Sequence, residues 1–177
     1  KVYINVGDAK VKKSLIALPP FQFYGSSADK RSLTLGKNLF QTISNDLLVS
    51  NYFKFIRHGA FLEDTSKVGL KPAPGAAHGF SFKTWKTIGS EFLVRGGYKI
   101  VNGNLNLEVY VYYVPQAKLI FGKTYEGPKS AFRKLAHTFA SDVVEKLTGK
   151  RAMFNSKIVT VSNFGGLRSK SVFVMDW

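Results

Sequence analysis

The stretch from Glu91 to Gly127 constrains the fold more than any other part of the chain. It reads EFLVRGGYKIVNGNLNLEVYVYYVPQAKLIFGKTYEG. Asn102-Gly103 is the strongest short hairpin signal, because both central residues of the favoured turn take positive φ. After this turn, apolar residues alternate with their neighbours over a long run. The residues that share one face are Leu105, Leu107, Val109, Val111 and Tyr113. We therefore expect a three-stranded antiparallel meander.

Two other segments have a helical period. From Ser32 an apolar stripe runs along one face, and Ser32 or Thr34 is the expected cap. The second helix follows Pro128, with Ser130 as its expected cap and Gly149 as its stop. The two stripes are Leu35, Leu39, Phe40, Ile43 and Leu47, and then Phe132, Leu135, Ala136, Phe139, Val143 and Leu147.

Short strands are expected at LIALPPF, which the two prolines end, and at NYFKFI. This order of elements predicts an α/β fold of two layers, in which a mixed β-sheet carries the two main helices on one face. Residues 57–80 show no period and read as a long functional or mobile loop. A short helix follows, with Phe82 and Trp85 packed inward.

The last segment, residues 157–177, predicts two alternating strands around a Gly-Gly turn. An isolated hairpin is marginally stable in water, so these strands are expected to open a larger β structure. An exposed hairpin also favours pairing between copies, which makes a dimer through this segment a second expectation.

The composition is strongly basic, with 26 Lys and Arg against 11 Asp and Glu and a formal net charge of +15. Such a charge attracts polyanions, so a basic domain that binds nucleic acid or an anionic surface non-specifically is one candidate function. Specific recognition of nucleic acid would need a reading helix or stacking aromatics interleaved with the cations, and the cations here are scattered. No cysteine is present, which excludes disulfides and thiolate metal sites. No apolar run is long enough to predict a transmembrane helix.

Catalytic residues were sought among the polar side chains of the second helix. His137 and Ser141 share a helix face, but Asp142 lies about 140° around the helix from His137, which argues against a hydrolytic triad. We expect these three residues to be helix-surface groups that contact a neighbouring domain. His58 and His78 lack the ligand pattern of a zinc site. The sequence therefore predicts no catalytic site, no metal site and no cofactor.

The first residues, KVYINV, alternate like a half-buried strand, with Val2, Ile4 and Val6 on one face. Two interpretations are open. The segment either completes the sheet of its own domain or adds to the sheet edge of a partner, where backbone hydrogen bonds supply affinity.

A resemblance bears on this choice. The run AHTFASDVVEKLTGKRAMFNSKIVTV resembles the end of the N-terminal domain of the TolB family, where a helix leads into the first strand of a β-propeller. Upstream, Asp46, Leu47, Ser50 and Phe53 resemble a second family segment, and Asn51 stands where the family usually has glycine. The matching residues of the later run are His137, Ser141, Asp142, Glu145, Lys146, Leu147, Thr148, Gly149, Phe154, Ile158 and Val161.

The resemblance implies a non-catalytic periplasmic adaptor of the Tol–Pal envelope-maintenance system. It implies that the N-terminal segment binds the C-terminal domain of a TolA-like protein, and that a Pal-like lipoprotein binds only through the propeller. The partner-binding residues are then Lys1, Val2, Tyr3, Ile4, Asn5, Val6, Gly7 and Asp8. The implied division is a binding strand with its linker over residues 1–13, an α/β domain over 14–154, and part of a first propeller blade over 155–177.

Overall fold

The computed structural model describes residues 13–25, 29–163 and 170–176. Its first half contains β1 (Ser14–Ala17), β2 (Gln22–Phe23), α1 (Lys30–Val49), β3 (Phe53–Phe55), the 3₁₀ turn η1 (His58–Ala60) and α2 (Phe82–Thr87). Its second half contains β4 (Phe92–Val101), β5 (Asn104–Tyr113), η2 (Val114–Gln116), β6 (Lys118–Pro128), η3 (Lys129–Ala131), α3 (Phe132–Thr148), β7 (Lys157–Ser162) and β8 (Ser171–Asp176).

A mixed six-stranded sheet forms the centre of the fold. Its strand order is β3-β1-β4-β5-β6, and β2 pairs with β4 beyond the end of β1. The pairings of β1 and β2 are parallel, whereas β4, β5 and β6 form the expected antiparallel meander. Asn102 and Gly103 have φ values of 50° and 78°, which confirms the predicted hairpin turn. The predicted mixed sheet is thus confirmed.

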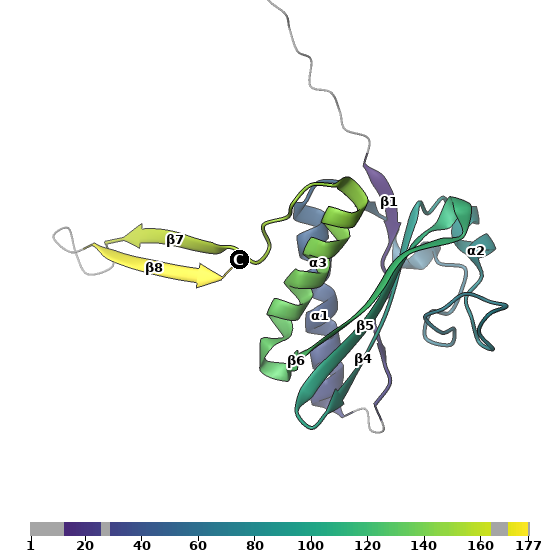
Figure 1. Ribbon diagram of the computed structural model, residues 1–177, viewed down its shortest axis with the longest axis horizontal. Helices are drawn as coiled ribbons and strands as arrows, with labels where there is room; N and C mark the ends of the chain where they lie inside the picture. Colours follow the sequence, from purple (N-terminus) through teal and green to yellow (C-terminus); the bar gives the residue numbers. More distant parts are fainter. Residues whose placement is uncertain (1–12, 26–28, 164–169, 177) are drawn as a thin grey trace, which may run out of the picture.

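The helices α1 and α3 cover one face of this sheet, here called the helix face (Figure 1). Their predicted stripes supply the main core, because residues three and four apart lie on one side of a helix. The helix residues that are fully buried there include Leu39, Ile43 and Leu47 of α1, and Ala136, Phe139 and Val143 of α3. From the sheet they meet Ile16, Val94, Leu105, Leu107, Val109 and Val111.

Helix α1 approaches the sheet most closely at Gly36. A Cβ atom built there would lie 2.1 Å from the hydroxyl oxygen of Tyr98, which is closer than side chains tolerate. The same hydroxyl donates a hydrogen bond to the carbonyl oxygen of Ser32, at 3.0 Å. The glycine that weakens the helix in isolation is therefore required by its packing on β4.

Both predicted helix N-caps are wrong. The N-cap of α1 is Asp29, whose Oδ1 accepts a hydrogen bond from the backbone N–H of Ser32 at 2.8 Å. Ser32 therefore lies in the first turn. Ser130 lies in η3, and α3 begins after Ala131 without a side-chain cap. At the other end, Gly149 stops α3 with a φ of 69°, which confirms the predicted stop.

Residues 57–90, here called the loop layer, pack on the opposite face of the sheet, the loop face (Figure 1). The sequence predicted a long functional or mobile loop over residues 57–80, and Phe80 at its end is fully buried. Trp85 is also fully buried, which confirms the predicted inward side of α2. The second core cluster consists of Ala17, Phe80, Trp85, Leu93, Tyr112 and Val114.

Polar anchors hold the loop layer in place. The guanidinium of Arg95 on β4 is 1% exposed and donates to the carbonyl oxygens of Thr65, Val68 and Gly69, at 3.0, 2.7 and 3.2 Å. The hydroxyl of Tyr112 donates to the carbonyl oxygen of Leu70 at 2.9 Å. Burial lowers the pKa of Arg95, against the opposing charges of its surroundings. An irregular segment without apolar period is thus fixed by side chains that satisfy its backbone carbonyls.

The carboxylate of Glu63 is a further anchor of the loop layer. One oxygen accepts from the indole N–H of Trp85 at 2.8 Å, and the other accepts from the backbone N–H of Ser81 at 2.7 Å. Ser81 is the N-cap of α2, and Trp85 lies within the helix. Glu63 therefore joins the loop to α2 and satisfies a buried indole, which would otherwise lose a hydrogen bond to water on folding.

Strands β7 and β8 form a separate two-stranded sheet beside the main body (Figure 1). The connection to it is anchored, because Phe154 is buried in the main core. The hairpin itself exposes a set of apolar side chains: Ile158, Val159, Val161, Val172, Phe173, Val174 and Met175. The predicted pair of strands is therefore present, with its apolar residues open to a further layer.

Candidate partner-binding site

The predicted partner-binding residues 1–8 lie outside the described residues, so their pairing stays a prediction. The point where they join the domain is described. The backbone N–H of Ser14 donates to the carbonyl oxygen of Tyr52 at 3.0 Å, just after the end of α1. Lys150, just after the end of α3, places its Nζ 5.8 Å from the centroid of the Tyr52 ring. The N-terminal segment therefore joins the domain at the C-terminal ends of both main helices.

The first described strand already has two neighbours. Ile16 of β1 is in register with Phe55 of β3 on one side and with Phe92 of β4 on the other. Ser14 and Leu15, the β1 residues nearest the N-terminal segment, pair with β3, whereas the pairing with β4 begins at Ile16. In the described sheet β1 thus lies between β3 and β4.

The predicted interdomain residues make contacts within the domain. His137 is 7% exposed, and its Nδ1 lies 2.7 Å from Oδ2 of Asp46 on α1. The hydroxyl of Ser141 donates to the carbonyl oxygen of His137 in its own helix. The predicted contact of these residues with a second domain stays a prediction.

Asp142 points to the sheet. Its Oδ2 accepts hydrogen bonds from Lys123 Nζ at 2.6 Å and from the Tyr125 hydroxyl at 2.5 Å, both on β6. Burial raises the pKa of Tyr125, and the hydrogen bond to Asp142 raises it further. Asp142 and His137 thus have different partners, as expected from their positions around the helix, and they do not form a catalytic relay.

Sequence reasoning missed Asp46 as the partner of His137. Asp46 is buried at 2% exposure, and it follows Ile43 by three residues, which places it on the inward side of α1. A charged residue at an apolar stripe position was the available signal. Because buried charges are almost always paired, this position called for a polar partner on a facing element.

The histidines of the loop layer show no metal-binding arrangement. His58 Nε2 lies 3.1 Å from the carbonyl oxygen of Leu18, and its ring packs against Phe40 and Phe61. Among the residues that the structure describes, no group of three or more His, Asp or Glu side chains lies close enough to hold a metal ion. In the same described ranges, no helix has the length and apolar content needed to cross a membrane.

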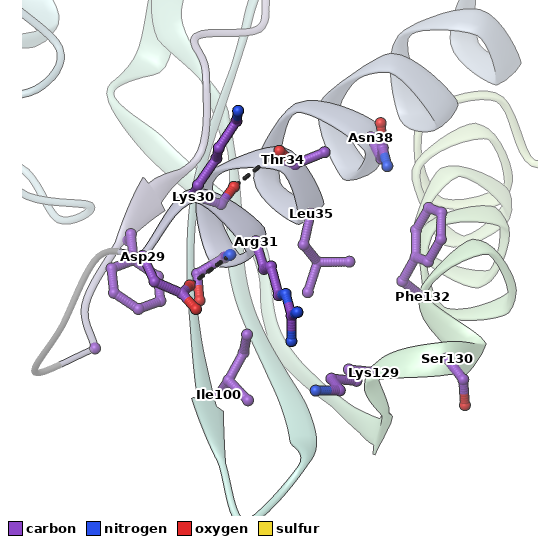
Figure 2. A pocket seen from close by; sticks show the side chains of 13 residues that line it. Asp29, Lys30, Arg31, Thr34, Leu35, Asn38, Ile100, Lys129, Ser130 and Phe132 are labelled. Atoms are coloured by element: carbon purple, nitrogen blue, oxygen red, sulfur yellow. Dashed lines mark hydrogen bonds between the residues drawn. The ribbon is translucent and has the colours of Figure 1, made fainter.

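A pocket of about 950 Å³ lies where α1 and α3 both begin (Figure 2). Residues from β2 and just after it, the first half of α1, the end of β4, and η3 with the start of α3 line it. Sequence reasoning did not predict this pocket, because its residues come from four distant segments and share no motif.

Comparison with known proteins decides the family. The model of the TolB amino-terminal domain matches residues 2–120. The chain belongs to the TolB amino-terminal domain family. The resemblance described from the sequence is thereby confirmed.

Individual relatives of the family agree with this assignment. The Tol-Pal system protein TolB of Desulfosudis oleivorans is 30% identical over 176 residues, which are 99% of this chain and 38% of that protein. The protein of the same name from Rickettsia peacockii is also 30% identical, over 98% of this chain and 37% of its own length. The chain thus spans less than two-fifths of the length of these relatives.

A solved structure supports the fold. The crystal structure of TolB from Acinetobacter baumannii superposes with a TM-score of 0.68 and 19% identity, over 95% of this chain and 37% of that one. The mixed sheet with its two helices is therefore an arrangement that a solved TolB structure shares.

Proposed function

We propose that this chain is the N-terminal part of a non-catalytic adaptor of the Tol–Pal system in the periplasm, and that residues 1–8 bind the C-terminal domain of a TolA-like protein. The observation that carries the proposal is the extent of the family match, which starts at residue 2, well before β1. The N-terminal segment therefore lies within the part of the chain that the family model covers. The relatives described above are Tol-Pal system proteins.

The local geometry supports a strand that is lent to a partner. Because β1 lies between β3 and β4, the described sheet already gives β1 a neighbour on each side without the alternating segment. An extended segment that adds to a partner's sheet gains backbone hydrogen bonds for affinity and alternate side-chain pockets for specificity. Docking of the same segment on its own protein would compete with this binding, and a ligand that released it would shift the population toward the binding form.

The test is calorimetric titration of the chain with the C-terminal domain of the cognate TolA-like protein. Deletion of residues 1–8 abolishes the heat of binding and leaves the thermal unfolding midpoint nearly unchanged. The matched pair of variants divides the strand by face: Val2→Ser, Ile4→Ser and Val6→Ser together weaken binding strongly, whereas Lys1→Ser, Tyr3→Ser and Asn5→Ser together have the smaller effect.

Two results count against this proposal. A deletion variant that binds as tightly as the parent places the binding surface elsewhere. A deletion that lowers the unfolding midpoint as well as the affinity shows that residues 1–8 complete the domain's own sheet, which is the alternative interpretation of the alternating pattern.

The net charge of +15 favours a second candidate, a basic domain that binds nucleic acid or an anionic surface. Its exposed cations lie on different elements, with Lys37 on α1, Lys86 on α2 and Lys118 on β6. If charge alone acts, titration with duplex DNA gives weak association that falls steeply with salt. A tight complex that survives moderate salt would instead favour this second function.

A further inference from the structure

The pocket at the start of the two main helices combines an apolar interior with a basic rim. Phe23 of β2, Leu35 of α1, Ile100 of β4 and Phe132 of α3 supply the apolar surface. Arg31 of α1 and Lys129 of η3 belong to the same lining, and both are exposed. Figure 2 shows Arg31 extending between Ile100 and Leu35, and Lys129 pointing toward Ile100. Its volume of about 950 Å³ is within the range of pockets that hold ligands.

The charge of the pocket is net positive. Its one carboxylate, Asp29, accepts the hydrogen bond of the Ser32 backbone N–H and so serves as the cap of α1. Hydrogen bonds from the side chain of Ser32 and from its backbone N–H lower the pKa of Asp29, and the nearby charges of Arg31 and Lys129 contribute to the same shift. Arg31 and Lys129 therefore outnumber the acid that they surround. The net positive charge of the described lining residues therefore favours the binding of a negatively charged group.

The pocket is far from the point where the N-terminal segment joins the domain. It lies at the N-terminal end of α1, whereas the N-terminal segment joins the domain near Tyr52, after the C-terminal end of α1. A helix of 20 residues at 1.5 Å per residue separates the two ends by about 30 Å.

From the charge and shape of this pocket we propose that it is a second protein-binding site, which takes an acidic segment of a partner protein. The segment inserts a bulky apolar side chain between Leu35, Ile100 and Phe132. Carboxylates beside that side chain pair with Arg31 and Lys129. This proposal does not depend on the function of residues 1–8.

The lining favours a peptide over an acyl chain. An acyl chain needs a continuous apolar tunnel that removes it from water. Here polar side chains interrupt the wall, with Thr34 and Asn38 on α1 and Ser130 on η3, and the cationic rim is open to solvent. Polar groups spaced along a wall match the amide groups of a peptide, and the separated apolar contacts match single side chains. A guanidinium beside an apolar surface also suits a carboxylate flanked by a hydrophobic residue.

The experiment uses the whole chain and a short, end-capped, fluorescent peptide that carries a phenylalanine and a leucine between glutamates. Fluorescence anisotropy measures its affinity, and amide chemical shifts locate it. The test variant combines Arg31→Gln with Lys129→Gln. Its matched control combines Lys83→Gln with Lys86→Gln on α2, which removes the same charge from exposed positions outside the pocket lining. A third variant, Ile100→Ala, removes apolar surface from the pocket alone, since Ile100 is absent from both core clusters.

We expect the variant with Arg31→Gln and Lys129→Gln to bind the peptide about tenfold or more weakly than the parent. The control pair should change the affinity less than about twofold, and Ile100→Ala should lower it several-fold. The shifted amides should cluster at Leu35, Ile100 and Phe132. Equal loss in both charge pairs would mean that net charge alone attracts the peptide and would overturn the proposal. So would tight binding of dodecanoate in the pocket with no binding of the peptide, because it would assign the site to an anionic amphiphile. Amide shifts confined to residues outside the pocket would overturn it as well.

Discussion

The two faces of the sheet are covered in different ways. On the helix face, α1 and α3 present apolar stripes that interlock with the sheet through residues such as Phe139 and Ile43, both fully buried. On the loop face, an irregular segment lies on the strands and is fixed by buried polar donors, chiefly Arg95 and Tyr112. Dispersion and the burial of apolar surface stabilise the packing on the helix face. The packing on the loop face also depends on hydrogen bonds to the backbone carbonyls of the loop layer.

This difference has an energetic consequence. Apolar packing is non-directional and tolerates small shifts, so losses on the helix face scale with the volume removed. Arg95 donates to three carbonyl oxygens of the loop layer, and the side-chain amide of Gln22 also donates to those of Thr65 and Val68. Loss of Arg95 therefore leaves the carbonyl of Gly69 without its donor and the other two with one donor fewer. We therefore expect a substitution in the core of the helix face to lower the free energy of unfolding of the whole domain. A substitution on the loop face should first open the loop layer by local unfolding.

The largest effect is expected from Phe139→Ala on the helix face. The ring is fully buried and packs against Tyr125, at 5.9 Å between ring centroids, and against Phe121. The cavity should lower the free energy of unfolding by about 3–5 kcal/mol. Urea denaturation measures the loss, and hydrogen exchange should show weaker protection on both faces. Leu48→Ala, at an exposed position of α1, is the control, and its effect should stay within about 0.5 kcal/mol.

A somewhat smaller effect is expected from Arg95→Met on the loop face. The variant keeps an apolar stem but leaves the carbonyls of Thr65, Val68 and Gly69 without this donor. We expect a loss of about 3 kcal/mol, concentrated in the loop layer. Hydrogen exchange should quicken at residues 61–70 while the amides of α1 and α3 keep their protection.

The control for Arg95→Met is Arg133→Met, at an exposed position of α3, which removes the same charge without a buried carbonyl. A uniform loss of protection over both faces in Arg95→Met would contradict the comparison. It would mean that the loop layer and the helix face unfold as one unit.

The smallest effect is a dependence on alkaline pH that both faces share. Burial raises the pKa of Tyr112 on the loop face and of Tyr125 on the helix face above the ordinary value of 10.0, and it raises the pKa of Tyr110 to about 12. A group whose pKa is raised by folding stabilises the protein fully below its unfolded pKa and loses this contribution as the pH rises through the folded value. Stability should therefore be constant up to about pH 10 and fall between about pH 10 and 12.

Urea denaturation at about pH 9 and about pH 11 measures this fall. Tyr125→Phe should make it smaller, because one of the tyrosines that resist ionisation is removed. A fall of the same size in Tyr125→Phe and in the parent would assign the alkaline sensitivity to other groups, with Tyr112 next to be replaced.

Much of the helix face could be predicted from the sequence, because its signals are local. The Asn102-Gly103 turn, the stripe through Leu39 and Ile43, and the stop at Gly149 each depend on residues within one or two turns of each other. The caps were the local failure. Asp29 competes with Ser32 for the same role, and only the position where the chain enters the helix decides between them.

The loop layer and the binding surfaces could not be predicted in this way. Arg95 lies in an apolar strand, and no residue near it in the sequence predicts which carbonyl oxygens, some thirty residues away, accept its hydrogen bonds. The pairing of Asp46 with His137 spans 91 residues, and the pocket at Arg31 and Lys129 joins segments almost 100 residues apart.

The sequence by itself determined the family, the meander and the two apolar stripes, since periodicity and turn chemistry act over short distances along the chain. Only the tertiary structure decided which carbonyl oxygens accept hydrogen bonds from Arg95 and which carboxylate lies beside His137. It also decided where a pocket with apolar and basic side chains forms. Those features depend on the packing of distant segments, and a buried polar group takes the partner that folding brings within reach.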